Sequence, residues 1–296
     1  MNILITGSSG LIGSELMAYF KNQGHKIYQM KRTSDETNAY YWLPEQNIIK
    51  YNESLSIDVV INLAGYSIAN KRWTQKIKNR ISSSRINSTK LLSQKLAAIN
   101  IKPKLFISGS AIGYYGDCGN EIINESGNNG NGFLAEVCKN WEMATNAAEE
   151  SGIRTIHLRL GVVISKNGGL IKKLLTPFKL FLGGVLGKGN QYMSWIGLVE
   201  LCRIIDFLIH EKNIHGAVNI TSPNPITNAE FTKILGGILK RPTIFFIPGI
   251  FLKLIFGEMA NDMILSSTRA IPEKLQKAGY QFLDKTMIQS LKNEIN

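Results

Sequence analysis

A glycine-rich turn stands near the start of the chain, between a short apolar segment and an amphipathic one. NILIT (2–6) has the branched apolar residues of a buried strand, and TGSSGLIG (6–13) follows it. The next residues carry apolar side chains at helical spacing as far as Gly24. Glycines in such a turn permit a tight bend, a close approach of the backbone to a pyrophosphate, and close helix–strand packing. The feature therefore predicts the first βαβ unit of a dinucleotide-binding sheet.

The same alternation of apolar strands and longer periodic helices continues through the first half of the chain. Strands are expected at 26–32, 58–65, 104–111 and 155–164, and helices at 74–98 and 133–151. This order is typical of an α/β fold with a doubly wound, parallel, Rossmann-type sheet. We expect the NAD(P)-binding domain to cover residues 1–165 with parts of 190–225. A smaller C-terminal α/β substrate lobe is expected mainly at 166–296.

Two segments carry specific packing expectations. The helix at 74–98 is expected to turn its basic and serine residues outward and its isoleucines and leucines inward. The most apolar stretch, IFFIPGIFLKLIFG (244–257), is interrupted by Pro248 and Lys253 and is too short to span a bilayer. We expect it to pack as a helix under the C-terminal lobe.

The end of the second expected strand indicates which dinucleotide binds. NAD-binding folds place an acidic residue about 20 positions after the glycine turn, where it accepts the ribose 2′-hydroxyl. Here Lys31 and Arg32 occupy that place, and the first acid after the second strand is Asp35. A guanidinium pairs with a 2′-phosphate and a carboxylate repels it, so NADP(H) is favoured over NAD(H). The alternative is that Lys31 and Arg32 are a solvated strand end.

Composition limits the other classes of function. The formal net charge of +12 favours anionic ligands, but the basic residues are scattered, so nucleic-acid binding is not expected. Three widely spaced cysteines and four histidines form neither a disulfide framework nor a metal motif, and no metal is expected. The first residues look like a core strand and not like a targeting segment. We therefore expect a cytoplasmic protein without a membrane partner.

Three motifs together point to a family. With the glycine turn, the NLAG turn (62–65) and SGSAIGYYG (108–116), the chain resembles the extended short-chain dehydrogenase/reductase superfamily. It is most similar to an atypical branch of NAD(P)-dependent epimerase-like proteins of unknown substrate. The resemblance covers essentially the whole chain, including a tail at 240–296 that is typical of this branch.

The resemblance implies a set of cofactor-binding residues. Asn62, Leu63, Ala64 and Gly65 would line the adenosine side, and Asn87 matches a helix asparagine that supports the catalytic lysine of the superfamily. Ser108 and Ser110 match strand-end positions that hold the substrate serine, and 159–162 follow a strand near the nicotinamide. The full expected set is Gly7, Ser9, Gly10, Leu11, Ile12, Gly13, Lys31, Arg32, Asn62, Leu63, Ala64, Gly65, Asn87, Ser108, Arg159, Gly161 and Val162. The resemblance also makes a homodimer possible.

The superfamily's acid–base pair, Tyr-x-x-x-Lys, has no match in this chain. The pattern puts Phe133 or Leu134 in place of the tyrosine and Val137 or Cys138 in place of the lysine. Lys139 is one or two residues late, which turns it to another helix face. Ser110, Tyr114 and Tyr115 are the remaining candidate catalytic residues. Cys138 and Glu142 are weaker candidates, since Glu142 also suits a surface ion pair.

Two functions remain open from the sequence. The chain is either an NADP(H)-dependent oxidoreductase or epimerase-like enzyme with an unusual acid–base set, or a non-catalytic NADP(H)-binding sensor or interaction protein. The first would take a small or nucleotide-linked, anionic substrate. The second is favoured by the missing Tyr/Lys pair.

Overall fold

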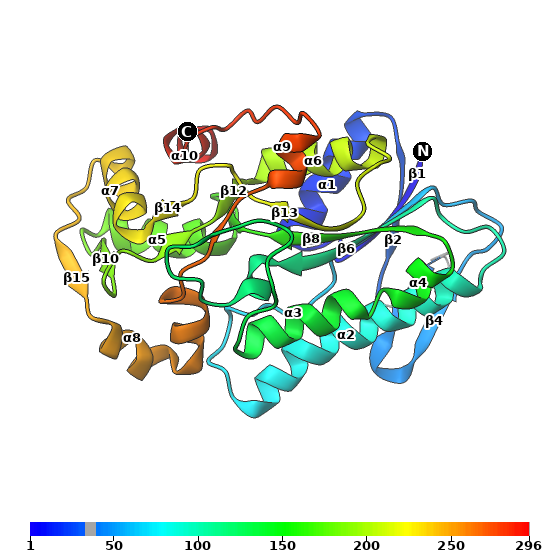
Figure 1. Ribbon diagram of the computed structural model, residues 1–296, viewed down its shortest axis with the longest axis horizontal. Helices are drawn as coiled ribbons and strands as arrows, with labels where there is room; N and C mark the ends of the chain where they lie inside the picture. Colours follow the sequence, from blue (N-terminus) through cyan, green and yellow to red (C-terminus); the bar gives the residue numbers. More distant parts are fainter. Residues whose placement is uncertain (33–39, 296) are drawn as a thin grey trace. The chain divides into compact units, whose positions relative to one another are not determined.

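The computed structural model describes residues 1–32 and 40–295 of the chain. Its centre is a six-stranded parallel sheet with the strand order β13-β8-β6-β5-β1-β2 (Figure 1). The strands are β1 (Asn2–Thr6), β2 (Lys26–Met30), β5 (Val59–Asn62), β6 (Leu105–Ala111), β8 (Arg154–Leu160) and β13 (Gly216–Ile220). The order reverses between β1 and β5, which makes their carboxyl ends the switch point at which such sheets bind ligands. The predicted doubly wound parallel sheet is confirmed.

The strand register aligns the carboxyl ends of four neighbouring strands. Thr6 of β1 stands beside Met30 of β2 and Asn62 of β5, and Asn62 stands beside Ser108 of β6. The turns that follow these residues therefore leave the sheet on the same side, at the carboxyl ends of the strands.

Helices cover both faces of this sheet (Figure 1). On one face lie α1 (Leu11–Asn22) and α6 (Leu198–His210), where the Tyr19 hydroxyl donates to the Asp206 carboxylate at 3.2 Å. On the other lie α2 (Gln75–Ala98), α3 (Phe133–Met143) and α4 (Asn146–Glu150). The single helix predicted at 133–151 is instead two helices. Short-range backbone hydrogen bonds at Thr145 and its neighbours form a turn between them.

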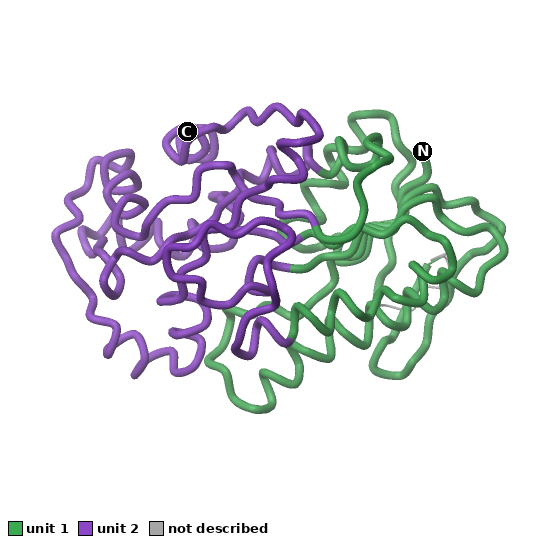
Figure 2. The backbone as a smooth tube through the Cα atoms, viewed as in Figure 1, with its two compact units in different colours: residues 1–110, 137–158, 205–217 green, residues 111–136, 159–204, 218–296 purple. Residues whose placement is uncertain are grey.

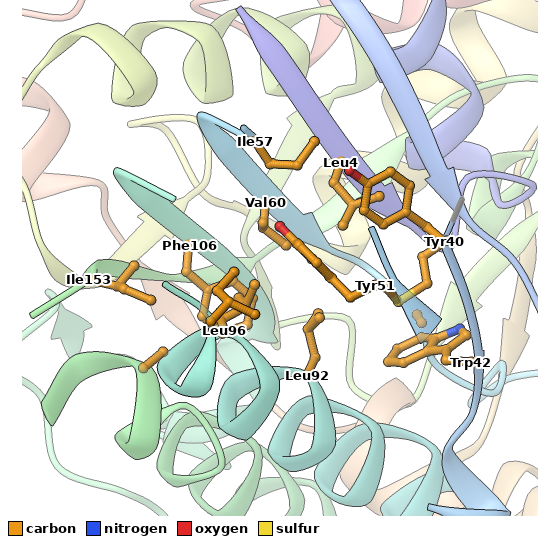
Figure 3. Packing of buried hydrophobic residues seen from close by; sticks show 14 residues of the cluster. Leu4, Tyr40, Trp42, Tyr51, Ile57, Val60, Leu92, Leu96, Phe106 and Ile153 are labelled. Carbon is orange, nitrogen blue, oxygen red and sulfur yellow. The ribbon is translucent and has the colours of Figure 1, made fainter. Parts of the chain in front are cut away.

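The core beneath α2 combines strand, helix and hairpin residues (Figure 3). Leu4, Val60 and Phe106 from the sheet pack with Leu92 and Leu96 of α2. A hairpin that sequence patterning missed, β3 (Tyr40–Leu43) and β4 (Ile48–Tyr51), adds three aromatic side chains to the cluster, Tyr40, Trp42 and Tyr51. Residues 33–39 lie outside the described residues, and they include Asp35, the first acid after the second strand.

The expectation that α2 turns its serines outward is wrong for Ser88 and Ser93, which are fully buried. Ser93 Oγ donates to the Thr145 carbonyl and accepts from the Ala148 amide, both at 2.9 Å. A short hydroxyl side chain lets α2 approach the start of α4 closely while its polar atom stays paired.

The chain divides into two compact units (Figure 2). The first consists of residues 1–110, 137–158 and 205–217, and the second of 111–136, 159–204 and 218–296. In the second unit Ile164, Phe178, Trp195, Phe231 and Leu291 belong to a separate buried cluster. The helices of this unit are α5 (Gly169–Lys179), α7 (Asn228–Leu239), α8 (Gly249–Phe256), α9 (Glu273–Lys277) and α10 (Met287–Ile295).

Short strand pairs complete the second unit. They are β9 (Val162–Ile164) with β12 (Trp195–Gly197), β10 (Gly184–Leu186) with β15 (Phe245–Ile247), β11 (Tyr192–Met193) with β14 (Ile226–Thr227), and β7 (Ile122–Ile123) with β16 (Arg269–Ala270).

The apolar stretch 244–257 does not form the buried helix expected of it. It forms β15 and, after Pro248, the short helix α8, and most of its large side chains are exposed. Proline ends the strand and begins the helix because it cannot continue a hydrogen-bonded ladder. None of the helices in the described ranges combines the length and the apolar content needed to cross a bilayer.

Candidate functional site

The glycine turn between β1 and α1 is tightly packed. Gly7 has a φ of +68°, and a Cβ there would lie 2.7 Å from the carbonyl carbon of Leu63. A Cβ on Gly13 would lie 2.3 Å from the Gly7 carbonyl oxygen. These two positions therefore require glycine, one for its backbone conformation and both for the close approach of neighbouring backbone. The turn after β1 and the NLAG turn after β5 are in direct contact.

The amino end of α1 is available to an anion. Gly10 is the N-cap residue, and in the described part of the chain no side chain caps it. Ser9 and Gly10 are exposed, and Leu11 and Ile12 are half-buried. The first amide N–H groups of a helix lack intrahelical acceptors and lie at its positive dipole end. The turn and this helix end together fit the pyrophosphate of a dinucleotide.

The end of β2 carries two exposed cations. Met30 is buried in the core, while Lys31 and Arg32 immediately after it are exposed. Because Met30 stands level with Thr6 at the edge of the glycine turn, both cations follow the strand end where a dinucleotide's adenosine ribose is bound in this type of fold. The arrangement suits a 2′-phosphate.

A buried polar network fixes the two turns. Thr6 Oγ1 donates to Asn62 Oδ1 at 2.7 Å and accepts from the amides of Leu63 and Ala64 at 3.2 Å. Asn62 Nδ2 donates to Thr89 Oγ1 at 2.7 Å. The Asn62 side chain is thus engaged inside the protein and holds the NLAG turn in place. Sequence reasoning singled out Asn62 but missed Thr6 and Thr89.

A hydroxyl–carboxylate pair lies at the end of β6. Ser110 Oγ donates to Glu142 Oε1 of α3 at 2.6 Å. Ser110 is buried, and Glu142 is half-buried. Ser108, two residues earlier, is fully buried and lies 3.5 Å from Asn62 Nδ2. The structure therefore brings together Ser110 and Glu142, two residues 32 positions apart in the sequence.

Helix α3 turns the residues that replace the lysine inward. Val137 and Cys138 are buried, and Lys139 is exposed, as the rotation argument predicts. Asn87 on α2 is exposed. The two residues expected in place of the lysine are therefore buried side chains without a positive charge.

Arg85 of α2 brings a cation to this region. Its guanidinium lies 5.2 Å from the Trp141 ring centroid, and a Cβ on Gly65 would lie 3.1 Å from its Cζ. Nη1 donates to the Tyr66 carbonyl at 2.9 Å. Burial lowers the pKa of Arg85 to about 10, against the opposing effect of neighbouring Cys138, so the group is charged at neutral pH. Sequence reasoning missed Arg85.

A second cluster lies within the other unit, around Tyr115. The buried Tyr115 hydroxyl donates to Asn219 Oδ1 at 2.7 Å and accepts from Arg159 Nη1 at 2.9 Å. Burial raises the pKa of Tyr115 to about 12, although Arg159 acts in the opposite direction. The Arg159 guanidinium also lies 3.6 Å from the ring centroid of Tyr114, which is half-buried. Tyr115 is therefore held neutral and fully bonded, and Tyr114 forms the more accessible face of the cluster.

Glu125 closes this cluster on one side. Its carboxylate accepts from the Asn219 amide at 3.1 Å and from the Lys274 amide at 3.3 Å. Burial raises the pKa of Glu125, partly offset by these hydrogen bonds. Asn219 and Lys274 were not found from the sequence, because they come from segments more than 90 residues away.

Gly161 and Val162, expected near the nicotinamide, lie at the start of β9. A Cβ on Gly161 would lie 2.8 Å from the Ser194 carbonyl oxygen, and Val162 pairs with Trp195 of β12. Close strand packing thus accounts for the glycine.

Comparison with known proteins identifies the chain's relatives. The model of the NAD dependent epimerase/dehydratase family matches residues 3–221. The chain belongs to this family. A second family model, for a domain of unknown function named DUF1731, matches residues 247–294 of the chain.

Individual relatives of this epimerase family agree. The chain is 39% identical to the epimerase family protein Mb2239 of Mycobacterium bovis over 98% of its own length and 96% of the relative's. A crystal structure of human epimerase family protein SDR39U1 with NADPH has a TM-score of 0.90 at 27% identity, covering 99% of both chains. A nucleoside-diphosphate sugar epimerase from Corynebacterium glutamicum has a TM-score of 0.81 at 32% identity, covering all of this chain and 58% of that one.

These relationships confirm the predicted epimerase-like family and its Rossmann fold. The roles expected for individual site residues stay predictions.

Proposed function

We propose that this protein is an NADP(H)-dependent oxidoreductase or epimerase-like enzyme that acts on a small or nucleotide-linked, anionic substrate. The packed glycine turn, the uncapped start of α1 and the exposed Arg32 support the choice of cofactor. The related human protein SDR39U1 was crystallised with NADPH, which supports the same choice. When bound, the cofactor supplies or accepts a hydride at the substrate carbon.

The Ser110–Glu142 hydrogen bond carries the catalytic part of the proposal. A general base must lie within hydrogen-bond reach of the proton that it removes, directly or through one relay group. In the oxidation of an alcohol, the substrate O–H proton passes to Ser110 Oγ while the Ser110 proton passes to Glu142 Oε1. The C–O bond becomes a carbonyl as the hydride leaves the carbon, and the reverse proton path serves reduction.

Arg85 supplies, in this proposal, the positive charge that the missing lysine would have carried. Its Nη1 donates to the Tyr66 and Ile81 carbonyls. Donors at Nε and Nη2 remain to bind hydroxyls of the nicotinamide ribose or an anionic substrate group. Its contact with Gly65 ties this cation to the NLAG turn.

The two tyrosines receive different proposed roles. Tyr115 holds the Arg159 guanidinium in place, because its hydroxyl is bonded on both sides. Tyr114, half-buried beside that guanidinium, is the proposed proton donor of this second cluster. A Tyr114→Phe variant would keep the ring contact and remove the proton.

Turnover measurements test the proposal. We expect NADPH oxidation by a member of a panel of carbonyl compounds and 4-keto nucleotide sugars, followed by loss of absorbance of the reduced cofactor. Ser110→Ala and Glu142→Gln should each lower kcat by about 10²–10⁴-fold, the usual contribution of general acid–base catalysis. Glu136→Gln changes an exposed carboxylate on the same helix and should leave kcat unchanged.

The second candidate function is a non-catalytic NADP(H) sensor. The observation that favours it is the burial of Val137 and Cys138 where a lysine is expected. Tight NADPH binding without oxidation across the whole panel would support the sensor and refute the enzyme.

A further inference from the structure

Helix α8 has apolar side chains around most of its circumference, and Lys253 is its one charged residue. Leu252 is buried at 4% exposure, whereas Ile250, Phe251, Leu254 and Ile255 are 54–65% exposed. At about 100° per residue these four side chains cover about 140° of the helix, on the side that faces away from Leu252. A helix with apolar side chains around most of its circumference is normally buried. The outer side of α8 therefore has the composition of a contact surface.

Two neighbouring segments extend this surface. Residues 244–246 lead into β15 and α8, and residues 180–182 follow α5; the large side chains of both segments are 46–81% exposed. Phe245 of β15 pairs with Gly184 of β10, and the Arg241 guanidinium lies 4.6 Å from the Phe181 ring centroid. We call residues 180–182, 244–246 and the four exposed α8 residues the apolar patch. It contains ten of the eighteen exposed large hydrophobic side chains found among the described residues.

The segments that form the apolar patch are flanked in the sequence mainly by cations, with the exposed Glu258 two residues after α8. The sequence has no Asp or Glu between Glu150 and Glu200, and none between Glu230 and Glu258. Within these two stretches Arg241 is half-buried, and six lysines near the patch in sequence are exposed, namely Lys172, Lys173, Lys179, Lys188, Lys240 and Lys253. Exposed apolar side chains are thus combined with six exposed lysines and, among the acids near them in sequence, with Glu258 after α8.

We propose that the apolar patch docks onto an anionic lipid surface. Interfacial helices insert an apolar face to the depth of the acyl boundary, while Lys and Arg contact anionic head groups. Here the α8 side chains and Phe245, Phe246 and Phe181 would supply the insertion, and the lysines would supply the attraction. No spanning helix is needed for this contact.

A second copy of the chain fits the patch less well. A symmetric dimer places the same surface on both partners, so the lysine-rich surroundings would face one another and repel. An anionic lipid surface complements both the apolar residues and the charge. This inference is independent of the reaction proposed above.

Vesicle sedimentation tests the proposal with the full chain. The probes are vesicles of phosphatidylcholine alone and vesicles of phosphatidylcholine and phosphatidylglycerol in equal parts. We expect binding to the second kind, weakened by added salt because exposed charges are screened. The double variant Phe251→Gln/Leu254→Gln should weaken it at least about tenfold, since each side chain loses apolar burial. Lys179→Glu/Lys253→Glu should weaken it about tenfold or more.

A matched control replaces exposed apolar residues of the same unit outside the patch. Leu283→Gln/Ile288→Gln should bind the anionic vesicles as the unchanged protein does, and all variants should keep the same Tm. Equal binding to both kinds of vesicle, or none, would overturn the proposal. So would a dimer in solution that Phe251→Gln/Leu254→Gln converts to a monomer without any vesicle binding, since the patch would then join two copies.

Discussion

We propose that the choice of cofactor depends on Arg32. It is exposed at the end of β2, where a 2′-phosphate can reach it. Arg32→Glu removes a charge-assisted hydrogen bond worth about 1.5–3 kcal/mol, so NADPH should bind about tenfold to a hundredfold more weakly. NADH should bind nearly as before. Titration calorimetry with both cofactors measures this, and Lys26→Glu, an exposed cation at the start of the same strand, is the control. Equal weakening of both cofactors would contradict the assignment.

Arg32 could be found from the sequence and Arg85 could not. Arg32 follows the glycine turn by a fixed number of residues within one βαβ unit, so spacing alone locates it. Arg85 acquires its role from Gly65 and Trp141, which reach it only when α2 packs beside the NLAG turn and α3. Ser110 and Glu142 differ in the same way, because the hydroxyl was found at a strand end and its bond to the carboxylate needs tertiary structure.

At the scale of elements, Thr89 of α2 joins its helix to α3 and to β5. Its hydroxyl oxygen accepts from Asn62 Nδ2 at 2.7 Å and from Trp141 Nε1 at 2.9 Å, in a fully buried position. Thr89→Val keeps the shape and leaves two donors without this acceptor. We expect a loss of about 2–4 kcal/mol in the free energy of unfolding, measured by urea denaturation. Ser83→Ala, on the exposed side of α2, should change it by less than about 0.5 kcal/mol. A loss of less than about 0.5 kcal/mol in Thr89→Val would mean that the hydrogen bonds of Thr89 do not stabilise the folded protein.

Periodicity located the long helix α2 and most strands of the central sheet, but it missed the β3–β4 hairpin and did not give the environment of each element. The helix expected at 74–98 is Gln75–Ala98, and the expected strands contribute to the central sheet, except that the strand expected at 155–164 divides at Gly161 into β8 of that sheet and β9, which pairs with β12. Periodicity counts apolar side chains, so it missed the buried hydroxyls of Ser88 and Ser93. It also assigned 244–257 to the interior, because hydropathy alone does not separate a buried helix from one with an exposed apolar side.

At the scale of the whole molecule, the first unit needs chain from beyond residue 165. Residues 205–217 belong to this unit, and they include the start of β13, the strand at the edge of the central sheet beside β8. The Arg154 guanidinium on β8 donates to the carbonyls of Leu208, Glu211 and Ile214. A fragment of residues 1–165 would lack these acceptors and would expose β8 as an unpaired edge, which favours aggregation over folding.

The fragment and the full chain should therefore respond differently to NADPH. A ligand at a hundredfold excess over its Kd stabilises the native state by about 2.7 kcal/mol, which raises the Tm of a chain of this size by about 5 °C or more. We expect this shift for the full chain in circular dichroism melts, and no cooperative transition for residues 1–165. Arg154→Met in the full chain should lower the Tm and leave the NADPH-induced increment in place, because the substitution removes hydrogen bonds far along β8 from the glycine turn. A cooperative melt of the fragment that NADPH shifts upward would show that residues 1–165 complete the cofactor-binding unit without β13.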